Sequence, residues 1–183
     1  MSQIANNVTA AKPSVGGAVY VAPAGTTLPT SATSSLGDTF KSLGYISEDG
    51  ITNSNSPSTD FIKAFGGDKV LPITEEREDT FQFKLLEMFN AEVLTQIYGS
   101  GNVTTGESEV TVKSNNTELS AYVYVIDLIM RDDRSKRIVI PVGYVSSVGD
   151  ITYSDSDAVG YEVTVTAQAD SDGNTHYEYI ETK

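Results

Sequence analysis

Apolar and polar residues alternate along several short stretches of the chain, which is the pattern of β-strands with one buried face. Clusters of Gly, Pro, Asn, Asp and Ser separate these stretches and mark turns. The predicted strands are 17–22, 60–65, 69–73, 109–113, 120–130, 136–143, 145–154, 161–169 and 176–181. So many antiparallel strands in a chain of 183 residues predict one mainly β domain, a sandwich or a barrel.

One stretch in the middle of the chain changes from this period to a helical one. Phe81 and Phe83 alternate with polar residues, whereas the apolar residues that follow recur at steps of three and four. Gly99 then supplies a helix stop. The pattern predicts a single α-helix at about residues 86–98, flanking the sheet.

Two segments lack an apolar pattern. Residues 1–16 are small and polar, with Pro13 as a breaker, and we expect an N-terminal arm without a core of its own. Residues 47–59 are also polar, and we expect a long loop, a kind of segment that usually serves function or contacts a partner. The expected organisation is therefore an arm followed by a single β domain over residues 17–183.

The charge balance narrows the possible functions. The chain has 12 basic and 25 acidic residues, which argues against binding to nucleic-acid phosphates, because that role requires a basic face. It has no cysteine, which excludes disulfides, thiolate zinc sites and cysteine nucleophiles. The start of the chain holds no basic leader, and no apolar run approaches the roughly 20 residues of a membrane helix. We expect synthesis in the cytoplasm, no membrane partner, and no glycan on Asn7, Asn102 or Asn115.

Residues 170–181 come closest to a metal motif. Oxygen-bearing side chains occupy the first, third, fifth, ninth and twelfth positions of a calcium-loop pattern: Asp170, Asp172, Asn174, Glu178 and Glu181. The sixth position, which needs glycine for a sharp turn, holds Thr175, and no flanking helices are predicted. A hairpin turn is the favoured interpretation, with adventitious calcium binding as the alternative.

Motifs for catalysis and cofactor binding are absent or broken. His176 is the only histidine, so neither a multi-histidine metal site nor a complete histidine-based triad is expected. No glycine-rich phosphate loop is present. Four carboxylates crowd around Arg77 in residues 75–80, but neighbours in sequence do not oppose one another across a pocket. We therefore assign no catalytic, cofactor-binding or metal-binding residue and expect no cofactor and no enzyme activity.

One basic cluster stands out in this acidic chain. It comprises four of the twelve basic residues, at one predicted hairpin tip: Arg131, Arg134, Lys136 and Arg137. Charged residues at such a tip discourage stray strand pairing. The alternative is a docking contact with an acidic surface on a second copy of the chain.

Four blocks of sequence together resemble the major tail tube proteins of long-tailed bacteriophages. They are GAVYVAPAGTTLPTSAT, LGYISEDGI, DFIKAFGGDKV and DTFQFKLLEMFNAEVLTQIYG, and the resemblance spans about residues 13–99, continuing more loosely to about 169. It implies a tail-tube β-sandwich with one flanking helix that assembles as stacked hexameric rings, without enzyme activity. Some relatives carry a C-terminal immunoglobulin-like domain, which this chain is not expected to contain.

The resemblance also implies a location and partners. A tube of this kind is part of the virion tail, guides the tape-measure protein during assembly, and conducts double-stranded DNA without binding it specifically. Tail-terminator and baseplate proteins are further expected partners. The arm at 1–16 and the loop at 47–59 are then expected to order against neighbouring subunits, and Glu48 and Asp49, between flexible Gly44 and Gly50, become candidate inter-subunit residues.

The polar faces of two alternating strands are candidates for the wall of the channel. The candidate residues are Thr80, Gln82, Lys84, Glu162, Thr164, Thr166 and Gln168. An acidic, polar wall repels DNA phosphates over a Debye length of about 8 Å. The alternative is that these faces meet the outer solvent.

Two other function classes remain open from the residues alone. A secreted or surface β-sandwich of the adhesin type shares this Ser-, Thr- and Asn-rich composition, although no signal peptide is expected here. An acidic hydrolase requires carboxylates from distant strands to converge in one cleft.

Overall fold

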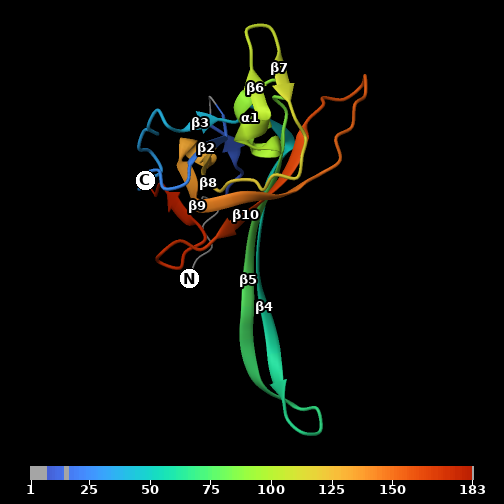
Figure 1. Cartoon of the computed structure of the whole chain (residues 1–183). Coiled ribbons are helices and arrows are strands. Elements are labelled where there is room, and N and C mark those ends of the chain that lie inside the picture. Colours follow the sequence, from blue (N-terminus) through green and yellow to red (C-terminus); the bar gives the residue numbers. More distant parts are fainter. Residues whose placement is uncertain (1–7, 15–16, 183) are drawn as a thin grey trace.

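The computed structural model describes residues 8–14 and 17–182, and the chain is mainly β (Figure 1). The strands are β1 (Lys12–Pro13), β2 (Val19–Pro23), β3 (Lys41–Ser42), β4 (Ile46–Lys63), β5 (Lys69–Leu85), β6 (Val103–Thr105), β7 (Val110–Val112), β8 (Tyr122–Ile129), β9 (Ser135–Val148), β10 (Tyr161–Gln168) and β11 (Tyr177–Ile180). Nine form one antiparallel sheet in the order β3-β2-β8-β9-β10-β5-β4, with β1 beside β8 and β11 beside β9. Helix α1 (Ala91–Tyr98) flanks it beside the small β6–β7 hairpin. The predicted fold class is confirmed.

The sheet is buried on both faces at its centre. Successive residues of β8 point to opposite sides of the sheet, and each side packs into its own core. Tyr124 and Ile126 join the larger core, which contains the apolar face of α1. Val123 and Val125 join a smaller core under the connection between β2 and β3, together with Leu36 and other apolar residues. A nearly continuous apolar run is therefore what this strand requires.

The β4–β5 hairpin is the most prominent departure from the predicted elements. The two strands pair from Ile46 and Leu85 to Lys63 and Lys69 and extend far beyond the rest of the molecule (Figure 1). The prediction of a loop over residues 47–59 is therefore wrong, since this segment is one long strand. Its outer part is exposed to solvent on both faces, so it carries no alternation of apolar and polar residues. The short strands predicted at 60–65 and 69–73 are the end of this hairpin.

Helix α1 begins five residues later than predicted. The Leu86 N–H donates to the Tyr45 carbonyl at 3.0 Å, which extends the strand ladder past the end of β5. Asn90 then caps the helix, because its side chain accepts a hydrogen bond from the Glu92 N–H at 3.0 Å. Gly99 ends the helix with a positive φ of 88°, as predicted.

Strand β9 replaces two predicted strands, 136–143 and 145–154. It runs unbroken to Val148, and residues 149–160 form an irregular connection instead. Pro141 and Gly143 lie where the register against β8 shifts between Tyr122 and Tyr124. A proline costs no ladder hydrogen bond at such an irregularity.

The described part of the N-terminal arm lies against the sheet. Lys12 and Pro13 pair with Ile129 and Leu128 of β8, and the Arg131 N–H donates to Thr9 Oγ1 at 2.8 Å. Residues 1–7 and 15–16 lie outside the described part of the chain.

Candidate assembly surfaces

The seven residues proposed for a channel wall share one face of the sheet. In the β5–β10 register, Lys84 is opposite Glu162, Gln82 is opposite Thr164, and Thr80 is opposite Thr166. Opposed residues in an antiparallel pair point to the same side. The alternate residues Phe81, Phe83, Val163 and Val165 are buried in the larger core.

This polar face is continuous with its neighbouring strands. Gln82 donates to the Glu162 carboxylate at 2.5 Å, and Thr166 donates to Ser146 Oγ on β9 at 2.7 Å. On the other side, β4 places Thr52 opposite Gln82. The face is therefore polar across four strands. Its orientation toward a channel stays a prediction.

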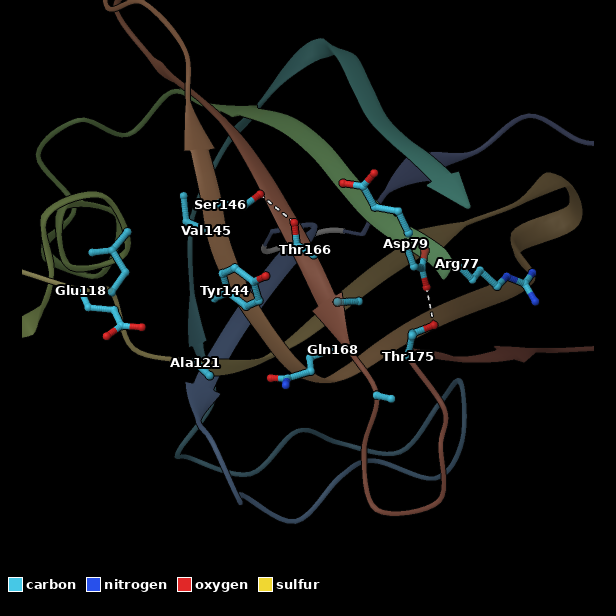
Figure 2. A pocket seen from close by; sticks show the side chains of 14 residues that line it. Arg77, Asp79, Glu118, Ala121, Tyr144, Val145, Ser146, Thr166, Gln168 and Thr175 are labelled. Atoms are coloured by element: carbon cyan, nitrogen blue, oxygen red, sulfur yellow. Dashed lines mark hydrogen bonds between the residues drawn. The ribbon is translucent and has the colours of Figure 1, made fainter. Parts of the chain in front are cut away.

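A broad cavity opens at the root of the β4–β5 hairpin (Figure 2). Its volume is about 1130 Å³, and Thr166, Gln168 and Tyr144 line it from the polar face. Arg77, Glu78 and Glu118 add charge around it. The mixture of exposed polar and charged groups resembles a surface that contacts solvent or protein more than a pocket for an apolar ligand.

Asp79 is buried beside this cavity, at the point where the hairpin leaves the body. Its carboxylate accepts hydrogen bonds from Thr175 Oγ1 at 2.6 Å and Asn53 Nδ2 at 2.9 Å, and lies 2.5 Å from His176 Nδ1. Burial raises the pKa of Asp79. The hydrogen bonds and His176 together lower that pKa by more than burial raises it, so the pKa of Asp79 is below its ordinary value. His176 also meets Phe81 edge to face. His176 thus links the C-terminal segment to the root of the hairpin inside the subunit.

Arg137 is not available for docking, which corrects its selection as an inter-subunit candidate. Its guanidinium is buried and pairs with both carboxylate oxygens of Asp127, at 2.6 and 2.8 Å. It also donates to the carbonyls of Ser31 and Ser34. Its role is to fasten the β2–β3 connection over the smaller core. No local pattern in the sequence indicates this role, because the two backbone acceptors are about a hundred positions away from Arg137.

The other three basic candidates remain at the surface. Lys136 pairs with Glu178 of the neighbouring β11 at 2.7 Å. Arg131 lies in a short 3₁₀ turn, Arg131–Asp133, and the Arg134 side chain donates to the Arg131 carbonyl. The structure therefore leaves a contact with a second copy open for this turn.

Glu48 and Asp49 are exposed in a bulge of β4, between the pairs that Ile46 and Ile51 make with β5. Gly50 has a positive φ of 78°, which fits the predicted backbone freedom. Both acids line a cavity of about 660 Å³, which we call the acidic cavity, with Asp150 and Asp157 from the β9–β10 connection. Their selection as inter-subunit residues remains a prediction.

An apolar surface that sequence analysis missed lies at the hairpin tip, which we define as residues 60–73. Its members with large exposed side chains are Ile62, Phe65, Val70, Leu71 and Ile73. The sequence signal is the two short apolar runs at 60–65 and 69–73, which predict strands but do not indicate what covers them. In the structure, no described part of the same chain covers them.

A second apolar surface lies between the end of β5 and the start of α1. It is a cavity of about 660 Å³, which we call the α1 cavity, lined by Leu86, Met88, Phe89 and Val159 among others. The Phe89 side chain is 86% exposed. Leu86 and Phe89 produced the helical spacing in the sequence, yet neither belongs to the helix.

The candidate calcium loop is a turn. Asp170 accepts hydrogen bonds from the N–H groups of Asp172 and Asn174 and from the Tyr177 hydroxyl. Within residues 8–14 and 17–182, His, Asp and Glu do not gather into a cluster that could hold a metal ion. The amides of Asn102 and Asn115 bond to each other, and Asn7 lies outside the described residues.

Comparison with known proteins places the chain in a family. The phage tail tube protein family matches residues 4–183. Among solved structures, a chain of the sheath–tube complex of an extracellular contractile injection system (PVC, extended state) is 9% identical, with a TM-score of 0.46 and 93% of each chain covered. The tube-terminating cap of the anti-feeding prophage is 10% identical, with a TM-score of 0.43, covering 99% of this chain and 100% of that one. No curated protein matches the chain.

The family assignment rests on the first of these matches, which covers nearly the whole sequence. In the described residues, none of the helices has the length and apolar character needed to cross a membrane. The β-rich fold with one flanking helix agrees with the expectation from the sequence blocks. The chain belongs to the phage tail tube protein family and is a structural component of a virion tail.

Proposed function

We propose that this chain polymerises as stacked hexameric rings that form the tail tube, without catalytic activity. The observation that carries the proposal is the long β4–β5 hairpin with its uncovered apolar tip. A hairpin of two strands has no core to stabilise it in water. Contact with neighbouring copies would supply the missing burial.

Closure of a ring would also protect the exposed edges of the sheet. Strands β3 and β4 are at the ends of the strand order and present unpaired backbone groups. Pro57 in β4 and Pro72 in β5 lack an N–H and so discourage unwanted strand addition along the hairpin. Packing these edges around a closed ring protects them in every copy.

The polar face of β5 and β10 would line the channel. Most of its side chains are neutral, Gln82 bonds to Glu162, and Lys84, which lies opposite Glu162, is the one cationic residue among the seven candidates. Six copies at −13 each carry a formal charge of −78 per ring. DNA and the tape-measure protein would pass such a wall without specific binding.

The remaining parts of the proposal concern assembly. The subunit would be made in the host cytoplasm and polymerise from a baseplate-side complex to a terminator protein. Residues 1–16 would act as an arm that contacts a neighbouring subunit or ring, in addition to the pairing of Lys12 and Pro13 with β8 of their own chain. Deleting residues 1–15 removes that short pairing but no residue of either core, so it is expected to leave the fold intact but impair stacking, and tubes of normal length from the truncated protein would refute this role.

A hairpin-tip variant tests the function directly. Phe65→Ser with Leu71→Ser removes two exposed apolar side chains and no buried contact, so we expect an unchanged thermal unfolding temperature but loss of high-mass species in light scattering. Thr27→Ala with Ser171→Ala, at exposed positions outside the hairpin tip, is the matched control. Wild-type mass in the tip variant would contradict the proposal.

A further inference from the structure

We propose that the hairpin tip of one copy docks into the α1 cavity of a second copy. This inference rests on the proposed function, because it names the two surfaces that meet when copies assemble. Both surfaces are apolar and exposed in the single chain. Exposed apolar patches of this kind mark sites of protein–protein contact.

The tip is shaped to enter a cavity. Phe65 lies at the end of the tip and is fully exposed. Gly66 and Gly67 follow it and form the turn, with positive φ angles of 115° and 98°. A Cβ at either glycine would meet nothing within 4 Å. A single aromatic side chain on a narrow, unobstructed turn is the kind of anchor that fills a pocket on a partner.

The α1 cavity offers matching chemistry. Its lining is mainly aliphatic and aromatic, with Met88 as an adaptable side chain and Phe89 standing out into solvent. Asn90 and Glu87, at its edge, already bond to each other and to the segment before β4. The rim is therefore held in place before any partner arrives.

The two surfaces of one chain cannot meet each other. The turn at the end of the tip, residues 64–68, precedes β5 and the cavity follows the end of β5, so the 17 residues of this strand separate the turn from the cavity by roughly 50 Å. Figure 1 shows the tip and α1 at opposite ends of the molecule. The contact must be between copies, and a head-to-tail contact generates rings or stacks.

A pair of lysines at the tip adds a candidate charge contact to the apolar match. Lys63 and Lys69 are directly opposite each other, and like charges in that position disfavour the isolated hairpin. Asp60 and Asp68 lie in the same segment, and Lys69 Nζ lies 4.4 Å from the centre of the Phe61 ring. The α1 cavity shares Leu86 and Ala158 with the acidic cavity, which Glu48 and Asp49 line. When Phe65 enters the α1 cavity, the two lysines would meet those acids. This assigns a partner to the inter-subunit acids predicted from the sequence.

Cysteine cross-linking tests the contact, because the chain has no native cysteine. Ala64→Cys with Phe89→Cys, which keeps the Phe65 anchor and is oxidised after assembly, is expected to give a ladder of disulfide-linked multimers on a non-reducing gel. Each single variant can give dimers at most. Ala64→Cys with Ser171→Cys, which places the second thiol in the exposed turn between β10 and β11, is the control and should give no ladder.

A charge exchange gives a second readout in case the cysteine variants assemble poorly. Lys63→Glu with Lys69→Glu is expected to lower the assembled fraction about tenfold, and adding Glu48→Lys with Asp49→Lys should restore it. Three outcomes would overturn the tip-to-cavity contact without contradicting tube formation. They are assembly of the cysteine variant without a ladder, an equal ladder in the cysteine control, and a further loss of assembly when the two charge exchanges are combined. Failure of the wild-type chain to assemble would instead count against the proposed function.

Discussion

At the scale of single residues, the groups that matter most are polar side chains held inside the subunit. Arg137 and Asp79 each join parts of the chain that are distant in sequence, the first under the β2–β3 connection and the second at the hairpin root. The local sequence indicates neither role, because Arg137 lies in a basic cluster and Asp79 in an acidic run, and both patterns are typical of surface charges.

Substitution of Arg137 should destabilise the subunit. Arg137→Met leaves Asp127 without its bidentate partner in a half-buried position, and we expect a loss of about 3 to 5 kcal/mol in the free energy of unfolding. Arg137→Lys keeps the charge but not the planar fork, so it should recover only part of the loss. Denaturant unfolding of the three proteins measures this, and equal stability of Arg137→Met and wild type would contradict the assigned clamp.

Asp79 should make stability depend on acid pH. Its pKa is lowered in the folded chain, so the charged carboxylate stabilises the fold above the unfolded pKa of about 3.9, and this contribution is lost as the pH falls through the folded pKa. Wild type should therefore exceed Asp79→Asn in stability at pH 7, and the difference should narrow below about pH 4. Urea unfolding over pH 3 to 7 checks this, and a constant difference would show that the charge is not involved.

At the scale of elements, the chain falls into segments that local pattern predicts well and segments that it does not. The strands at 80–85 and 161–168 have one buried and one exposed face, so their alternation was visible in the sequence. Residues 47–59 are exposed on both faces for most of their length and are specified by pairing with β5, which no local pattern reports.

The start of α1 shows a related failure, because apolar spacing persists where the backbone is held by other contacts. The Leu86 N–H donates to the Tyr45 carbonyl, and the helix begins only after Asn90, which caps it. We expect Asn90→Ala to cost about 1 kcal/mol, whereas Asn90→Ser, which keeps a capping oxygen, should cost less. Hydrogen exchange should speed up at the first amides of α1 in the alanine variant alone. Unchanged exchange there would place the helix start elsewhere.

At the scale of the whole molecule, the single subunit leaves apolar surfaces uncovered that a second copy could bury. A well-buried sheet carries a projecting hairpin, an apolar tip and an apolar cavity at opposite ends. Sequence blocks were enough to predict the family and the fold, and the polar face was found by its alternation. The two complementary surfaces required the structure, since their exposure depends on where the chain leaves its core.

The most direct test of the account is a cryo-electron microscopy map of the polymer formed by the purified chain. We predict closed rings of six subunits, stacked into a hollow tube, with Gln82, Thr164 and Thr166 facing the channel. A chain that stays monomeric at high concentration, or a tube with this polar face on its outer surface, would contradict the account.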